Sequence, residues 1–100
     1  MTIPEFLNNV QTDLNVKIID KLDKTFNSHD FLEKFAEIFE SEYIDFLNYY
    51  KGKGAFRVVH SQIGKYLRKH ENDLKIKGIG KTDSKNLFGN FDGIEKWGKI

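Results

Sequence analysis

The stretch "IKGIGKTDSK", Ile76–Lys85, contains the residue types of a phosphate-binding loop. A loop of the G-x-x-x-x-G-K-[ST] kind wraps backbone N–H groups around phosphate oxygens, and its first glycine lies five positions before its second. The residue five positions before Gly80 is Lys75, and Gly78 is too close to Gly80 to form the wrap. We therefore expect no nucleoside triphosphate site here and interpret "GIGKT", Gly78–Thr82, as a basic, flexible turn.

The three histidines, His29, His60 and His70, are the other candidates for chemistry. No two of them lie three or four positions apart on an expected helix, and no H-E-x-x-H pattern accompanies them. Their spacing also yields no Ser–His–Asp constellation. The chain has no cysteine, which excludes disulfides, thiolate catalysis and cysteine–zinc sites. We expect neither catalysis nor a metal or other cofactor.

The charged residues divide the chain into two unlike halves. Residues 1–50 contain four Lys against ten Asp or Glu, a net charge of −6. Residues 51–100 contain twelve Lys or Arg against five Asp or Glu, a net charge of +7. Such an asymmetry suggests that one half meets a polyanion, or that the halves attract each other or a second copy.

The basic half contains the residues that we predict to bind nucleic acid. Lys and Arg side chains would displace counterions from the phosphate backbone, and two polar side chains would reach base edges. An ordinary solvated face is the alternative interpretation of the same residues. The predicted site consists of Lys65, Arg68, Lys69, Lys75, Lys77, Lys81, Ser84, Lys85 and Asn86.

The acidic half is expected to be helical throughout. Thr2 as N-cap, with Pro4 and Glu5 in the first turn, begins an amphipathic helix over residues 1–27 that is interrupted near Asn15. A second helix over residues 31–50, capped by Ser28, has a broad aromatic face that we assign to the core. The apolar positions with helical spacing are Leu7, Val10, Leu14, Ile18, Leu22, Phe35, Ile38, Phe39, Tyr43, Phe46, Leu47 and Tyr50.

The basic half is expected to alternate short helices with strands. Phe56–Val59 is predicted to be extended, and Ser61–His70 to be a helix with the basic side chains in water. Leu74–Gly80 alternates apolar and basic residues as a half-buried strand does. A short helix is then predicted over Asp83–Gly89, followed by a closing strand over Gly93–Ile100.

The order of elements from Phe31 onward is that of a winged helix-turn-helix. Within that class, "GKGAFRVVHSQIGKYLRKHENDLKIKGIGKTDSKNLF" resembles the LOTUS (OST-HTH) domain. The likeness consists of apolar spacing together with Gly64 and the pair Gly78 and Gly80. The resemblance implies binding of RNA or of a protein partner without catalysis.

We therefore expect a single domain over residues 1–100. It would be mainly α with a small β wing, an N-terminal helix over residues 1–27 preceding a winged-helix-like portion over residues 28–100. The predicted function is noncatalytic binding of DNA or RNA. The alternative is a protein-interaction or inhibitor module that docks through its acidic N-terminal helices, on another protein or a second copy. No apolar run is long enough for a membrane span, so we expect a cytoplasmic protein without a membrane partner.

Overall fold

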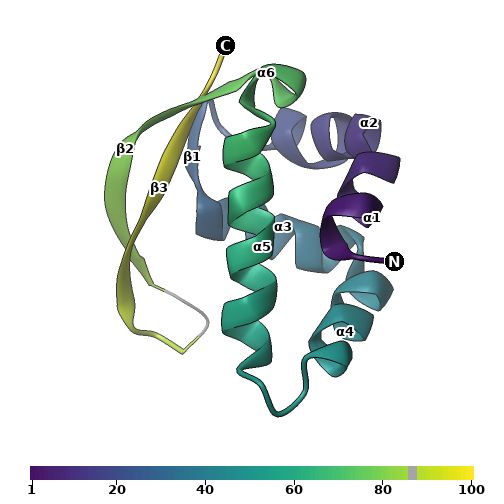
Figure 1. Cartoon of the computed structure of the whole chain (residues 1–100). Coiled ribbons are helices and arrows are strands. Elements are labelled where there is room, and N and C mark those ends of the chain that lie inside the picture. The colour runs from purple at the N-terminus through teal and green to yellow at the C-terminus, as the bar shows by residue number, and fades with distance from the viewer. Residues whose placement is uncertain (86–87) are drawn as a thin grey trace.

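The computed structural model describes residues 1–85 and 88–100, which are mainly helical with one three-stranded antiparallel sheet (Figure 1). The helical elements are α1 (Ile3–Asn9), α2 (Gln11–Asp13), a π-helical turn (Leu14–Ile18), a 3-10 turn (Ile19–Lys21), α3 (Ser28–Ile38), α4 (Glu40–Tyr49), α5 (Ala55–Lys69) and α6 (Glu71–Leu74). The strands are β1 (Thr25–Asn27), β2 (Ile76–Lys85) and β3 (Phe91–Lys99). In this described part, no helix has the length and apolar character needed to cross a membrane.

The N-terminal helical segment begins as the sequence predicts. The N–H of Glu5 donates to the Thr2 hydroxyl at 3.3 Å, and the Glu5 carboxylate accepts from the Thr2 N–H at 3.4 Å, which completes a capping box. The segment ends earlier than predicted, because helical geometry stops at Lys21 and Thr25–Asn27 form a strand. That strand pairs with β3, near the other end of the chain. Local spacing in the sequence cannot predict such a long-range pairing.

The helix predicted over residues 31–50 is broken at Phe39, where the backbone leaves helical geometry between α3 and α4. The break lets both helices contribute rings to one cluster. The ring centroids of Phe35 and Tyr43 lie 6.4 Å apart, whereas eight residues of straight helix rise about 12 Å. The N-cap of α3 is Asn27, not Ser28, and its side chain accepts a hydrogen bond from the N–H of Asp30 at 2.9 Å.

Helix α5 begins at Ala55, so the prediction of an extended piece over Phe56–Val59 was wrong. Val58 and Val59 favour a strand by their β-branched side chains. Burial of Val59 in line with Ile63 outweighs that preference, because the two side chains lie one helical turn apart in the core. Gly54 precedes the helix with φ = 73°, a left-handed conformation that suits glycine.

The short helix predicted over Asp83–Gly89 is not found in the described residues, because Asp83–Lys85 continue strand β2. Residues 83 to 85 pair with residues 93 to 91 of β3, so the hydrogen bonds of their backbone go to the sheet. The stretch around Gly80 also belongs to this strand, which corrects its interpretation as a flexible turn. A register shift between Gly78 and Gly80 marks a bulge, where Gly80 adopts φ = 124°.

The sheet has the strand order β1-β3-β2, with the central strand β3 against helix α3. Helix α5 contacts α1 and α4 on one side, and the β2–β3 hairpin extends along its other side (Figure 1). Trp97 of β3 is fully buried, and its indole N–H donates to the Ser28 hydroxyl at 3.1 Å. This bond joins the central strand of the sheet to the first turn of α3.

Candidate nucleic-acid interface

Helix α5 is amphipathic along its whole length, and this decides which of its side chains reach solvent. Its buried stripe consists of Val59, Ile63, Tyr66 and Leu67. The opposite stripe repeats at helical spacing and consists of Arg57, Ser61, Gly64, Lys65 and Arg68. Three cations therefore lie on one side of a single rigid helix.

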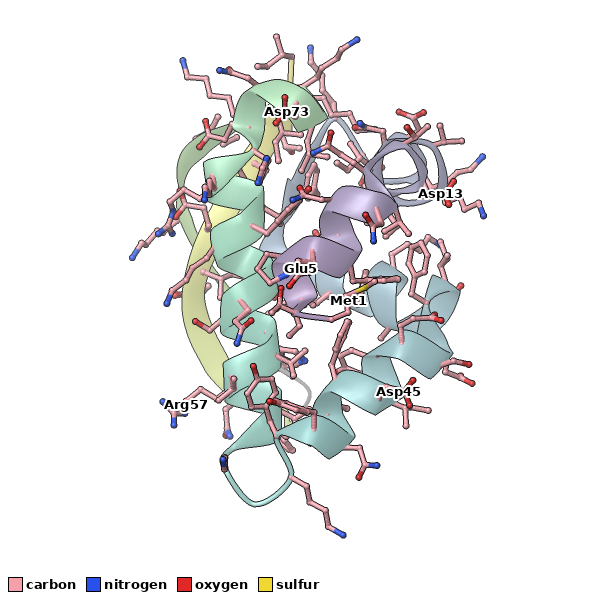
Figure 2. The ribbon with its side chains drawn as sticks, turned by 45° about the vertical axis from the view of Figure 1, so that its right-hand side comes forward. Met1, Glu5, Asp13, Asp45, Arg57 and Asp73 are labelled. Carbon is pink, nitrogen blue, oxygen red and sulfur yellow. The ribbon has the colours of Figure 1, made fainter. Side chains whose placement is uncertain are left out.

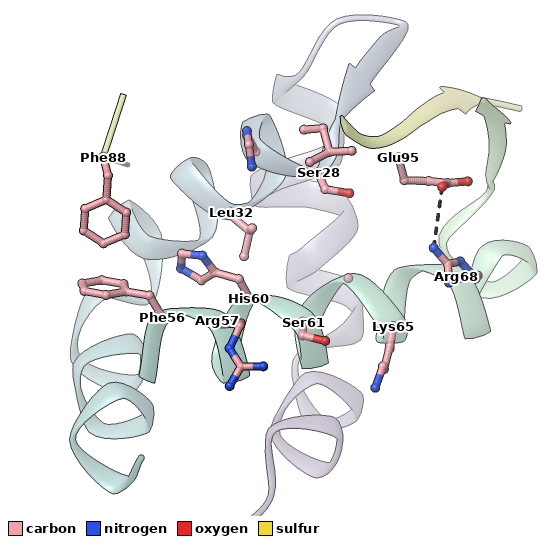
Figure 3. A pocket seen from close by; sticks show the side chains of 13 residues that line it. Ser28, Leu32, Phe56, Arg57, His60, Ser61, Lys65, Arg68, Phe88 and Glu95 are labelled. Atoms are coloured by element: carbon pink, nitrogen blue, oxygen red, sulfur yellow. Dashed lines mark ion pairs between the residues drawn. The ribbon is translucent and has the colours of Figure 1, made fainter. Parts of the chain in front are cut away.

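This exposed stripe borders a groove of about 610 Å³ between α5, the start of α3 and the hairpin. Figure 3 shows Arg57, Ser61 and Lys65 along α5, with Phe56 facing Phe88 at one end of the groove. Leu32, from α3, forms part of the apolar wall. The groove thus combines an apolar interior with a basic edge.

The other end of the groove contains one ion pair. Arg68 Nη2 lies 3.6 Å from Glu95 Oε2, as the dashed line in Figure 3 marks. Gly78 gives Glu95 room, since a Cβ at Gly78 would lie only 2.9 Å from Glu95 Oε1. The carboxylate partly neutralises Arg68, so Arg57 and Lys65 are the stronger candidates for contact with an anion.

Of the residues predicted from the sequence, the structure brings Lys65 and Arg68 together in the groove. Lys85 lines an adjoining cavity of about 270 Å³ that shares His29, Phe56 and His60 with the groove. These three cations come from α5 and from the end of β2.

The other predicted residues that the structure describes lie outside the groove lining. Lys69 lies at the C-terminal end of α5, and Lys75 follows α6 with φ = 55°. Lys77 and Lys81 lie on β2 and are exposed. Ser84 Oγ is hydrogen-bonded to His29 Nδ1 at 3.0 Å, which ties β2 to α3. Asn86 lies outside the described residues.

Three groove residues were missed by the sequence prediction. Arg57 precedes Ser61 and Lys65 by one and two helical turns, a signal hidden by the assignment of residues 56–59 to an extended piece. Phe56 and Phe88 meet with ring centroids 5.4 Å apart. No sequence spacing could have paired them, because they belong to segments 32 positions apart in the chain.

The histidines have structural partners. Nε2 of His60 lies 2.6 Å from the Tyr43 hydroxyl, and His70 Nδ1 lies 3.0 Å from Asp73 Oδ2. Burial lowers the pKa of His60, and the charge on His29 lowers it further. Burial also raises the pKa of Tyr43, so this pair is neutral at pH 7. Within residues 1–85 and 88–100, no three His, Cys, Asp or Glu side chains are grouped to hold a metal ion.

The acidic side of the molecule contains a different groove. It has a volume of about 470 Å³ and lies between the start of α1 and helix α4. Phe6, Phe46 and Tyr49 contribute apolar surface, while Glu42 and Asp45 contribute carboxylates. Figure 2 shows the acidic side chains of Glu5, Asp13 and Asp45 on the N-terminal helices and Arg57 on α5. These carboxylates therefore lie on helices other than α5, which contributes the basic stripe.

Comparison with known proteins gave no relative. No protein-family model matches the chain, and no curated protein sequence or solved structure matches it significantly.

Proposed function

We propose that this chain is a noncatalytic nucleic-acid-binding module that uses α5 and the β2–β3 hairpin as a winged helix uses its recognition helix and wing. The observation that carries the proposal is the stripe of Arg57, Lys65 and Arg68 along one exposed side of α5. From residue 57 to residue 68 the helix rises about 17 Å, enough to meet several phosphates of one strand.

The order of elements supports the winged-helix comparison. A strand, helices and a hairpin follow one another, and the hairpin pairs with the first strand in the order β1-β3-β2. In the proposed winged-helix comparison, α5 takes the place of the recognition helix. Lys77, Lys81 and Lys85 lie at every fourth position of β2 and would supply the phosphate contacts of the wing.

Salt dependence tests the proposal. We expect fluorescein-labelled DNA and RNA to bind at 50 mM salt, as measured by fluorescence anisotropy. If about five phosphates are contacted, affinity should fall by roughly a hundredfold to a thousandfold between 50 and 200 mM salt, because each contact releases condensed counterion. Absence of binding to both polymers at 50 mM salt would contradict the proposal.

A second candidate function has its own observation, the apolar groove flanked by Glu42 and Asp45. Its chemistry suits a protein segment in which one large apolar side chain is flanked by Lys or Arg. A peptide of that composition should bind the wild-type chain and lose affinity in Glu42→Gln/Asp45→Asn, while Arg57→Glu/Lys65→Glu retains it. Indifference of the peptide to the carboxamide variant would exclude this groove.

A further inference from the structure

The apolar end of the groove consists of two exposed aromatic rings. Phe56 is 40% exposed and Phe88 is 66% exposed, although the two rings contact each other edge to face at an interplanar angle of 84°. Phe56 also packs edge to face on the ring of His60, one turn further along α5, with ring centroids 5.9 Å apart. A pair of large apolar side chains left in water beside a cavity marks a binding surface more often than an isolated exposed ring does.

Cations continue directly from this aromatic pair. Arg57 follows Phe56 in sequence, and Lys65 lies two turns further along the same exposed stripe (Figure 3). The volume of about 610 Å³ is in the range of pockets that hold one small organic group. Among the residues that the structure describes, Glu95 is the only one that contributes a carboxylate to the groove lining, at the opposite end from the rings and beside Arg68.

We infer that the groove binds single-stranded nucleic acid, with an unpaired base stacked on the Phe56–Phe88 pair and the adjoining phosphates at Arg57 and Lys65. This inference rests on the proposed function and adds the form of nucleic acid that the site prefers. In a duplex both faces of each base are covered by neighbouring pairs, whereas an unpaired base can present a face to an aromatic side chain. Both forms present phosphates to Arg57 and Lys65, so a preference for the single strand would come from base stacking.

The test compares three labelled probes of equal length: a single-stranded oligonucleotide, its duplex, and an abasic strand with the same phosphates. By fluorescence anisotropy at 50 mM salt, the single strand should bind more tightly than the abasic strand. Phe88→Ala should reduce affinity for the single strand by roughly fivefold to a hundredfold and leave the abasic strand unchanged. Phe56→Ala should act in the same direction, and Phe56→Tyr should restore the wild-type affinity.

Tyr49→Ala serves as the matched control, since Tyr49 is an exposed aromatic residue of α4 outside this groove. Circular dichroism establishes whether each variant folds. If Phe56→Ala does not fold, Phe88→Ala still tests the inference. Equal binding of the abasic and the base-containing strands, unchanged in both Phe variants, would overturn the inference and leave the proposed function standing. If the duplex bound more tightly than the single strand and Phe88→Ala left its affinity unchanged, the inference would also be overturned and the proposed function would stand. Failure of all three probes to bind would remove the proposed function together with the inference.

Discussion

The Tyr43 hydroxyl and His60 Nε2 lie 2.6 Å apart and join α4 to α5 behind the basic stripe. The two rings are also stacked, with centroids 5.9 Å apart and planes 13° apart. Tyr43 lies on α4 and His60 on α5, so this contact packs the two helices against each other. The pair therefore links the core to the surface that Arg57 and Lys65 present.

The first prediction concerns acid. Burial lowers the pKa of His60 from its ordinary 6.5. Between the lowered pKa and 6.5, the unfolded chain binds a proton that the folded protein does not. The contribution of His60 to the free energy of unfolding is therefore complete above about pH 6.5 and is lost as the pH falls through the folded-state pKa. Thermal melting followed by circular dichroism should show a lower Tm near pH 5 than near pH 7.5.

His60→Gln supplies the control for this prediction, because glutamine keeps polar atoms near Tyr43 and does not titrate. The variant should have a smaller decrease in Tm over the same pH range. An identical decrease in the variant would assign the acid sensitivity to other groups.

The second prediction concerns charge in the groove. Arg57→Glu/Lys65→Glu should weaken binding of nucleic acid by about tenfold or more and lower the magnitude of the log–log salt slope by about two. The control is Lys21→Glu/Lys24→Glu, which makes the same change in net charge on exposed residues away from the groove. Anisotropy titrations at several salt concentrations measure both quantities. Equal losses in the two double variants would show that net charge, not the groove, governs affinity.

Much of the helical part of this fold could be predicted from local spacing. Thr2 forms the expected cap, and Leu7, Leu14 and Ile18 are buried as their period of three to four residues requires. The break at Phe39 had no such signal, because the aromatic spacing continues unchanged through it. At the break, the ring of Phe39 contacts that of Phe6, which lies far away in the sequence, and no local pattern contains this contact.

The candidate site was predicted less completely than the fold. Lys65 and Arg68 could be found because charge and helical period are local properties. Arg57 was missed because Val58 and Val59 suggested a strand, and tertiary burial overrode that preference. Phe88 could not be found at all, since its partner Phe56 lies in another segment and only the folded chain brings them together.

A third prediction concerns the core. Phe35 is fully buried and contacts the rings of Phe6, Phe31, Phe39 and Tyr43. Phe35→Ala should lower the free energy of unfolding by about 3–5 kcal/mol, through lost burial and the cavity that remains. Urea denaturation followed by circular dichroism measures the change.

Ile44→Ala is the control for the core prediction, because Ile44 is 54% exposed on α4. It should change the free energy of unfolding by no more than about 0.5 kcal/mol. A Phe35→Ala protein with wild-type stability would place the aromatic cluster outside the stabilising core.

The last prediction compares two glycines that both have open space around them. A Cβ at Gly64 or at Gly80 would meet no heavy atom within 4 Å. Gly64 lies inside α5, where alanine is the better helix former, so Gly64→Ala should raise the free energy of unfolding by about 0.5–1 kcal/mol. Gly80 has φ = 124°, a conformation that side chains disfavour, so Gly80→Ala should lower it by about 1–3 kcal/mol.

Urea denaturation measures the free energy of unfolding of both alanine variants. The comparison shows whether backbone conformation or available space determines the change. Space alone predicts the same small effect at both positions, whereas conformation predicts effects of opposite sign. Gly80→Ala should also disturb the bulge that begins at Gly78, since a relaxed backbone at residue 80 would change the pairing of Lys81 with Glu95. Gly80→Ala should then also change the affinity for nucleic acid, because Glu95 forms an ion pair with Arg68 of the groove. A Gly80→Ala protein as stable as wild type would show that the strand adopts another backbone path there.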